Sequence, residues 1–392
     1  MRLPLCLMRY ILKHISDIIE QYNGDIPLTH FLKRYYKQHT KLGSRDRKIL
    51  SEMTYCWYRC SKAVLDIQDF EQKLYLCLFL SDTENSYAGN FLPIQWQEGK
   101  QHSLQEKIAI LATEGILVDV EKINAYSGEF SYGIKKHEWS NSLLQQPSLF
   151  IRIRRDRQIV TKLLGEHGVP YHEISESCLS LPNGSSIDKF LPPALYVIQD
   201  ASSQQTGNYF QVNSNEYWWD CCSGAGGKSL LLKDKERTVK LTVSDKRQTI
   251  LHNLEERFAL YGHKPDRAFT LDMSDASSIK KQMRGQLFDN IICDVPCSGS
   301  GTWARTPEQA YFFDQSDLSF LSELQYSIAR NAAVYLKQGG TLYYITCSVF
   351  KSENENVVEK LKADGLKLKE LTLINGIAQR ADCLFIALLE KE

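Results

Sequence analysis

The sequence lacks several features that would assign it to a class at once. No run of about 18 apolar residues is present to cross a bilayer, so we expect no membrane contact. Its 47 basic and 47 acidic side chains leave no net charge, which argues against a general nucleic-acid coat protein. The 11 cysteines are scattered and have no accompanying histidine cluster, so we expect no metal site. Scattered thiols of this kind favour a reduced, cytoplasmic protein.

The 392 residues are enough for two or three domains. Residues 1–140 carry apolar positions at helical spacing and predict an all-helical domain. Residues 141–204 predict a small α+β module, because Leu149–Arg154 alternates apolar and basic residues as a half-buried strand does. From 205 to 392 strand and helix patterns alternate, which predicts an α/β fold with a doubly wound, Rossmann-like sheet. The predicted strands of this part are 217–219, 239–243, 267–271, 290–293, 341–345 and 384–388.

A glycine-rich turn follows the first of these strands and precedes a helix. Glycines allow close approach of a ligand to the backbone, and the helix start offers unpaired N–H groups. The turn has neither the glycine spacing of a dinucleotide fingerprint nor that of a phosphate-binding Walker loop. The predicted cofactor-binding residues of the turn are Cys222, Ser223, Gly224, Ala225, Gly226, Gly227 and Lys228.

Acidic residues end the next strands of the predicted sheet. Asp245 follows the second strand, where a carboxylate can accept hydrogen bonds from both ribose hydroxyls. Asp272 follows the third strand, where we expect the adenine, and Asp294 follows the fourth. Ligands of such sheets bind at the carboxyl ends of the strands. A cofactor with ribose and adenine but no pyrophosphate fits this pattern, and S-adenosylmethionine is the one we predict.

Two cysteines stand in loops after strands, in Asp294-Val295-Pro296-Cys297 and in Thr346-Cys347-Ser348. Carbon-5 of a pyrimidine needs a thiolate on carbon-6 before it can take a methyl group, and a second group must assist release. An acid near N3 aids the addition, which Asp294 can supply. The structural alternative is that these cysteines are buried in the core and have no catalytic role. The Ser flanks and the Pro-Cys pair favour cytosine-5 methylation of RNA instead.

These motifs resemble the Sun/Fmu-type RNA cytosine-5 methyltransferases. The turn Asp220–Lys228 is similar to the family's D-x-C-A-A-P-G-G-K, with Ser223-Gly224-Ala225 in place of Ala-Ala-Pro. The resemblance implies that Cys347 is the nucleophile and Cys297 the residue that assists product release. It implies cofactor contacts at Asp245, Asp272 and Asp294. It also implies that residues 1–140 form a NusB-like RNA-binding domain, which precedes the catalytic part in members that act on ribosomal RNA.

We therefore expect a monomeric enzyme whose partner is RNA, most simply 16S-type ribosomal RNA. Transfer RNA or 23S-type RNA with the same chemistry, and a noncatalytic RNA-binding or ribosome-assembly factor, stay open as alternatives. A nicotinamide-dependent dehydrogenase is disfavoured by the glycine spacing. The expected contacts to the RNA backbone are Arg152, Arg154, Arg155 and Arg305.

Overall fold

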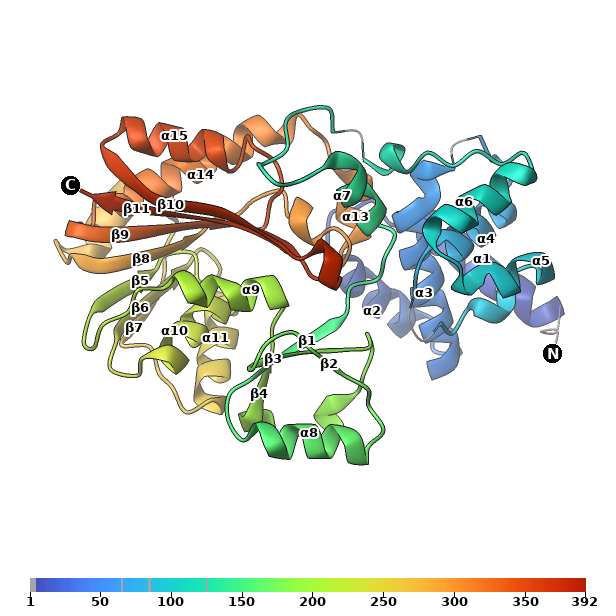
Figure 1. The fold of residues 1–392 in the computed structure, drawn as a ribbon, viewed down its shortest axis with the longest axis horizontal. Coiled ribbons are helices and arrows are strands. Elements are labelled where there is room, and N and C mark those ends of the chain that lie inside the picture. Colours follow the sequence, from blue (N-terminus) through green and yellow to red (C-terminus); the bar gives the residue numbers. More distant parts are fainter. Residues whose placement is uncertain (1–4, 65, 84–85, 125) are drawn as a thin grey trace. The chain divides into compact units, whose positions relative to one another are not determined.

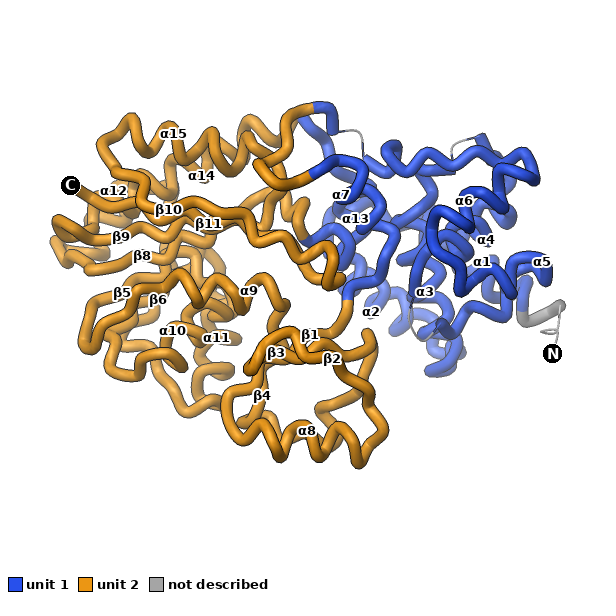
Figure 2. Tube along the Cα trace, in the orientation of Figure 1, with its two compact units in different colours: residues 1–127, 135–147, 302–315 blue, residues 128–134, 148–301, 316–392 orange. Residues whose placement is uncertain are grey.

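The computed structural model describes residues 5–64, 66–83, 86–124 and 126–392. Within them the chain forms two compact units, which Figure 2 colours separately. Unit 1 comprises 1–127, 135–147 and 302–315, and unit 2 comprises 128–134, 148–301 and 316–392. The three predicted domains, 1–140, 141–204 and 205–392, stay a prediction, since this division follows spatial contacts and not the sequence boundaries.

Unit 1 is helical in its described part. Buried apolar residues recur at helical spacing along α1 and α3, whereas Leu74–Leu80 of α4 is buried throughout. A short segment from far along the sequence, 302–315, belongs to this unit. Its helix α13 packs on α3, and buried Arg59 of α3 donates to Ala304 O at 2.8 Å. The helices are α1 (Leu5–Gln21), α2 (Leu28–Gln38), α3 (Ser44–Cys60), α4 (Phe70–Leu80), α5 (Ile94–Gln97), α6 (Leu104–Thr113), α7 (Lys136–Ser142) and α13 (Pro307–Phe312). The NusB-like assignment of this region stays a prediction.

Unit 2 contains a small antiparallel sheet with the strand order β2-β3-β1-β4 and one helix, α8 (Arg157–Glu166). Its core is a cluster of aliphatic side chains that includes Ile151, Val160 and Leu179. The strands are β1 (Leu149–Ile153), β2 (His172–Glu173), β3 (Cys178–Leu181) and β4 (Tyr196–Ile198).

The larger sheet of unit 2 has seven strands in the order β10-β11-β9-β8-β5-β6-β7. Strands β5 to β9 are parallel neighbours, and β11 and β10 close one side in antiparallel pairing. The α/β prediction is therefore confirmed, and each of its six strands is present. The strands are β5 (Tyr217–Asp220), β6 (Lys240–Asp245), β7 (Arg267–Thr270), β8 (Phe288–Asp294), β9 (Leu336–Thr346), β10 (Leu366–Asn375) and β11 (Cys383–Lys391).

Helices cover both faces of this sheet (Figure 1). On one face α12, α14 and α15 bury apolar side chains such as Ile279, Ile328 and Val358. On the other face α10 and α11 contribute Leu230 and Leu254. Because the five parallel strands point the same way, their carboxyl ends meet at one edge, where the predicted site residues lie. The helices are α9 (Ala201–Gln205), α10 (Gly227–Lys235), α11 (Gln248–Leu260), α12 (Ala276–Met283), α14 (Asp317–Ala333) and α15 (Glu355–Ala363).

Candidate active site

The glycine-rich turn joins the end of β5 to the start of α10 in unit 2. Gly224 and Gly226 have φ angles of 51° and 78°, a left-handed conformation that side chains other than glycine rarely adopt. A Cβ on Gly226 would lie 2.8 Å from Leu254 Cγ of α11. The turn therefore needs glycine at position 226 for its backbone conformation and for the close packing of α11.

Two buried polar groups in this turn have open hydrogen-bonding capacity. Asp220 Oδ2 accepts from Ser229 Oγ at 2.6 Å, whereas Asp220 Oδ1 has no partner in the described chain. The Ser223 hydroxyl, also buried, has none in the described chain either. Burial raises the pKa of Asp220 to about 7. Buried polar atoms normally find partners, so these two fit a site completed by a polar ligand.

Asp245 connects the turn to strand β6. Its Oδ2 accepts from the Gly224 amide at 3.0 Å, and its Oδ1 accepts from the Arg247 amide at 2.9 Å. Asp272, the acid predicted for the adenine, pairs with Lys246 at 2.7 Å, and the hydrogen bond from Lys246 lowers the pKa of Asp272. Both carboxylates thus accept hydrogen bonds at adjacent strand ends, as a ribose- and adenine-bearing cofactor would require.

Asp294, at the end of β8, forms an ion pair with Lys228 of the cofactor turn. Lys228 Nζ donates to Asp294 Oδ2 at 2.6 Å. Burial alone would lower the pKa of Lys228, but the attraction of Asp294 outweighs it, and the pKa is raised. The pair places a fixed positive charge beside the predicted catalytic acid.

The two predicted cysteines are brought together. Cys297 follows β8 and Cys347 follows β9, its parallel neighbour, and their Sγ atoms lie 3.2 Å apart. The hydrogen bond with Cys347 and burial raise the pKa of Cys297 well above its usual value. Two thiols in contact can share one proton, so that one carries the charge while the other stays neutral.

Gly301 lets the two cysteine loops approach. Its amide donates to Cys347 O at 2.8 Å, and a Cβ at this position would lie 2.1 Å from Cys383 O. No other residue leaves this space to the neighbouring backbone. The absence of a side chain at 301 is therefore a condition for the observed contact between the loops.

Of the predicted RNA contacts, Arg152 and Arg154 need correction. The side chains of both are buried, and both donate to Asp234 of α10, at 2.7 Å and 2.5 Å. Asp234 also accepts from His263 at 2.8 Å. The alternation in β1 predicts one solvent-facing side, but Asp234 of α10 binds both guanidinium groups on that side, so in this structure they stabilise the packing of unit 2.

The other two predicted RNA contacts remain predictions. Arg155 is exposed, just after β1, and Arg305 is half-buried in unit 1. One site residue to which sequence reasoning assigned no role is Glu353, a buried acid that contacts both cysteine loops. Its position a few residues after Thr346-Cys347-Ser348 gives no sign of these partners, which only the folded loops create.

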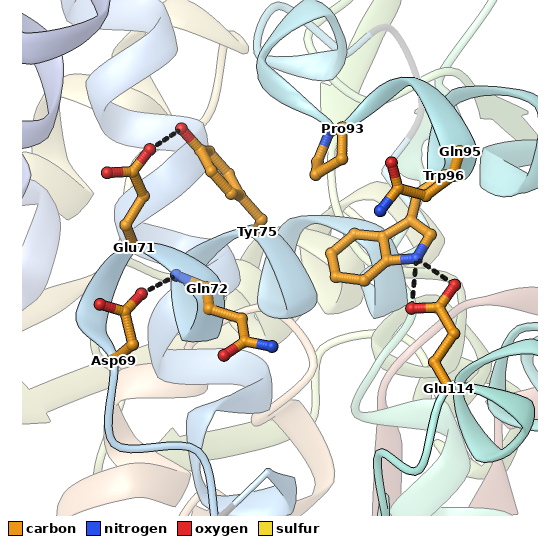
Figure 3. A pocket seen from close by; sticks show the side chains of 8 residues that line it. All are labelled: Asp69, Glu71, Gln72, Tyr75, Pro93, Gln95, Trp96 and Glu114. Atoms are coloured by element: carbon orange, nitrogen blue, oxygen red, sulfur yellow. Dashed lines mark hydrogen bonds between the residues drawn. The ribbon is translucent and has the colours of Figure 1, made fainter.

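Other cavities lie away from these residues. A cavity of about 340 Å³ in unit 1 is lined by two aromatic rings and three carboxylates (Figure 3). There Tyr75 donates to Glu71 at 2.7 Å and the Trp96 indole donates to Glu114. In unit 2 a cavity of about 210 Å³ is lined by Glu216, Asp289 and the 337–341 segment, around the amino end of β8. Neither contains a predicted site residue.

None of the described helices is long and apolar enough to cross a membrane. Across the same part of the chain, no three or more His, Cys, Asp or Glu side chains gather in a way that would hold a metal ion.

Comparison with known proteins finds relatives for the large sheet of unit 2 and the helices that cover it. Residues 208–381 match the family described as 16S rRNA methyltransferase RsmB/F. The ribosomal RNA small subunit methyltransferase B of Shewanella oneidensis is 30% identical over 177 residues, which are 45% of this chain and 40% of that protein. The probable methyltransferase B of Bacillus subtilis is 28% identical over 214 residues, or 53% and 46%. The chain thus spans less than half the length of these relatives.

Solved structures share the fold. The crystal structure of PH0851 superposes with a TM-score of 0.70 at 18% identity and covers all of both chains. NSun6 from Pyrococcus horikoshii, solved with SFG, has a TM-score of 0.57 at 15% identity, covering 65% of this chain and 94% of that one. The matched family supports S-adenosylmethionine as the cofactor. Residues 208–381 of this chain are therefore similar to the 16S rRNA methyltransferase RsmB/F family, in agreement with the resemblance of its motifs to the Sun/Fmu-type enzymes.

Proposed function

We propose that the protein is an S-adenosylmethionine-dependent RNA cytosine-5 methyltransferase acting on 16S-type ribosomal RNA. One observation carries the proposal, namely the 3.2 Å contact between Cys297 Sγ and Cys347 Sγ at the ends of adjacent strands. A methyltransferase acting on an amino or hydroxyl group needs no thiol, whereas carbon-5 chemistry needs one to attack and one to assist release.

The roles of the residues follow from the chemistry and the family resemblance. Cys347 Sγ forms a bond to carbon-6 of the cytosine, and the electron pair of the 5,6 double bond becomes available at carbon-5. Asp294, which accepts a hydrogen bond from Lys228 at 2.6 Å, is the acid that we assign to N3, where a proton from it would favour the addition. Bound S-adenosylmethionine supplies the methyl group. Cys297 then assists removal of the carbon-5 proton, the carbon-6–sulfur bond breaks, and the double bond forms again.

The cofactor site in this proposal consists of the glycine-rich turn with Asp245 and Asp272. The unpartnered Ser223 hydroxyl and the Asp220 Oδ1 atom support a polar occupant of the turn. Asp245 accepts hydrogen bonds from the ribose hydroxyls in addition to the one from the Gly224 amide, and Asp272 lies at the next strand end. No pyrophosphate cradle is needed, which agrees with the glycine spacing.

The substrate assignment draws on the relatives, which are named as methyltransferases of small-subunit ribosomal RNA. The target cytidine has to be unpaired or extruded, because carbon-6 cannot be reached within a stacked duplex. Arg155 and the basic residues of unit 1 are the candidates for phosphate contacts.

The test is incubation with S-adenosylmethionine tritiated on its methyl group and separate pools of unmodified 16S-type, 23S-type and transfer RNA. Nucleoside analysis then identifies the product. Label in 5-methylcytidine from the 16S-type pool alone is the expected result. Label from another pool would retain the chemistry and overturn the substrate, and absence of label from all three pools would overturn the proposed activity.

A further inference from the structure

We propose that Glu353 is a positioning residue that holds the Cys297 loop and the Cys347 loop as one unit and keeps their thiols in register. The inference rests on the proposed function, in which the two thiols act on the same base. Glu353 does not touch the reacting atoms; it acts through the residues that flank both cysteines.

The first set of contacts joins Glu353 to the Cys297 loop. Ser298, the neighbour of Cys297, donates its backbone amide to Glu353 Oε1 at 2.8 Å and its hydroxyl to Oε2 at 2.5 Å. Both hydrogen bonds are donated by the residue directly after Cys297. They therefore restrain the backbone that positions the Cys297 thiol. A carboxylate that accepts two bonds from one residue constrains its orientation as well as its distance.

The second set joins Glu353 to the Cys347 loop. The hydroxyl of Ser348, the neighbour of Cys347, donates to Glu353 Oε2, the same oxygen that accepts from Ser298 Oγ. Thr346, on the other side of Cys347, donates to Asn354 Oδ1 at 2.5 Å. Each cysteine is therefore flanked by a residue bonded to the same carboxylate oxygen.

A third element completes the attachment. Gln325 of α14 donates through Nε2 to Glu353 Oε1 at 2.9 Å and to Pro296 O, just before Cys297, at 3.0 Å. The Tyr344 hydroxyl of β9 donates to Glu353 O at 2.5 Å. Glu353 is completely buried, and these described partners are neutral donors. Keeping a charge in such a place is costly unless several hydrogen bonds compensate it.

The position of this charge also bears on the thiols. Cys297 Sγ contacts Cys347 Sγ at 3.2 Å, and the groups that interact electrostatically with these thiols are Glu353 and Tyr344 for Cys297 and Lys228 for Cys347. The negative charge of Glu353 is one of the causes that raise the pKa of Cys297. It thereby favours a neutral Cys297, as a residue that assists release and does not attack requires.

The experiment compares Glu353→Gln with Glu359→Gln. Glutamine keeps the shape and, after rotation of the serine hydroxyls, many of the bonds, but removes the charge. Glu359 is an exposed acid of α15 that pairs with Lys362 and contacts neither cysteine loop. For Glu353→Gln we expect kcat for RNA methylation to fall about a hundredfold, as displaced catalytic groups do. We expect KM for RNA and for the cofactor to stay within about twofold.

Alkylation of Cys297 with iodoacetamide, followed by mass spectrometry over a range of pH, provides a readout that needs no substrate. Loss of the Glu353 charge should move the reaction of Cys297 to lower pH, whereas Glu359→Gln should leave it in place. A kcat within threefold of the unchanged protein, or an unshifted Cys297 profile, would overturn the inference. If the unchanged protein methylates no RNA, the proposed function fails, while the alkylation profiles still decide the role of Glu353.

A second pair of variants applies if Glu353→Gln does not fold. Ser298→Ala and Ser348→Ala each remove one hydroxyl from Glu353 Oε2 without burying an unpaired charge. If Glu353 couples the loops, the double variant should lose much less activity than the product of the two single losses. Independent, multiplicative losses would contradict the coupling.

Discussion

Lys228 Nζ donates to Asp294 Oδ2 at 2.6 Å, and this bond joins the cofactor turn to the end of strand β8. The lysine belongs to the first turn of α10 and the aspartate ends the neighbour of β5 in the sheet. The pair therefore links the surroundings of the cofactor to those of the target base. A substitution of either residue therefore changes the electrostatic surroundings of both the cofactor and the target base.

Asp294→Asn should lower methylation by about a hundredfold, because an amide cannot transfer a proton to N3 as a carboxyl group can. Burial would then dominate at Lys228 and lower its pKa, which Asp294 now raises. Because its pKa is raised, the protonated Lys228 stabilises the fold at pH values below 10.5, its ordinary pKa. This stabilisation is lost as the pH rises through the pKa of Lys228 in the folded protein. Denaturation of both proteins should show a large stability difference at neutral pH that shrinks at alkaline pH.

The control for this change is Asp289→Asn at the opposite end of the same strand. Asp289 pairs with the more exposed Lys337 at 2.7 Å, far along β8 from the cysteine loops. Its methylation rate should stay near that of the unchanged protein. An equal loss of rate in both variants would indicate damage to the strand and not a role of the Asp294 charge.

Cys297→Ala should accumulate a covalent protein–RNA complex, because addition by Cys347 proceeds while release is impaired. The complex is visible as a slower band in denaturing gel electrophoresis with radiolabelled RNA. Cys347→Ala should abolish both methylation and the complex, and the double variant should resemble it. Normal turnover by Cys297→Ala would refute the two-thiol mechanism.

Asp234→Asn should destabilise the protein by about 3–5 kcal/mol, since it leaves two buried guanidinium groups without their charge partner. Burial would raise the pKa of Asp234, but the bonds from Arg154 and Arg152 outweigh it and lower the pKa to about 2. Because its pKa is lowered, the ionised Asp234 stabilises the fold at pH values above 3.8, its ordinary pKa. This stabilisation is lost as the pH falls toward about 2. Urea denaturation at neutral pH and in acid measures both effects, and an unchanged midpoint at neutral pH would contradict the ion-pair account.

Gly301→Ala should cost about 1–3 kcal/mol and reduce methylation, because the added Cβ would lie 2.1 Å from Cys383 O. Backbone atoms cannot move away as a flexible side chain would. Gly165→Ala in helix α8 is the matched control, since a Cβ there meets nothing within 4 Å. That variant should gain about 0.5–1 kcal/mol from helix propensity. Thermal denaturation of both separates the steric effect from the generic effect of replacing glycine.

Local patterns were sufficient for much of the fold and the site. Apolar runs with flanking turns located six strands of the large sheet, and the residues after them fell at one edge because parallel strands end together. Strand β10 (Leu366–Asn375) was not predicted, because lysines and a glutamate alternate with its apolar residues. It lies at the edge of the sheet and has one strand neighbour. An edge strand of this kind has no strong apolar signal.

Interactions between distant segments could not be predicted in the same way. The alternation of Arg152 and Arg154 with apolar residues gave the strand correctly, but their partner Asp234 lies about eighty residues further on. The placement of 302–315 in unit 1 is likewise a tertiary result, since nothing local separates this segment from its neighbours. Glu353 needed both cysteine loops in place before its contacts existed.

The shared carboxylate of Glu353 has a consequence for local unfolding. The Ser298 amide donates to Glu353, and the Val349 amide donates to Ser300 Oγ at 2.9 Å. In each loop, therefore, an amide is protected from exchange by a group that lies outside that loop. Neither amide can be exposed to solvent while the attachments between the loops persist. Hydrogen exchange at the two positions should therefore proceed through one common opening, with equal free energies, as in a single cooperative unit. The surroundings of the attacking thiol and of the assisting thiol would then be lost and regained together.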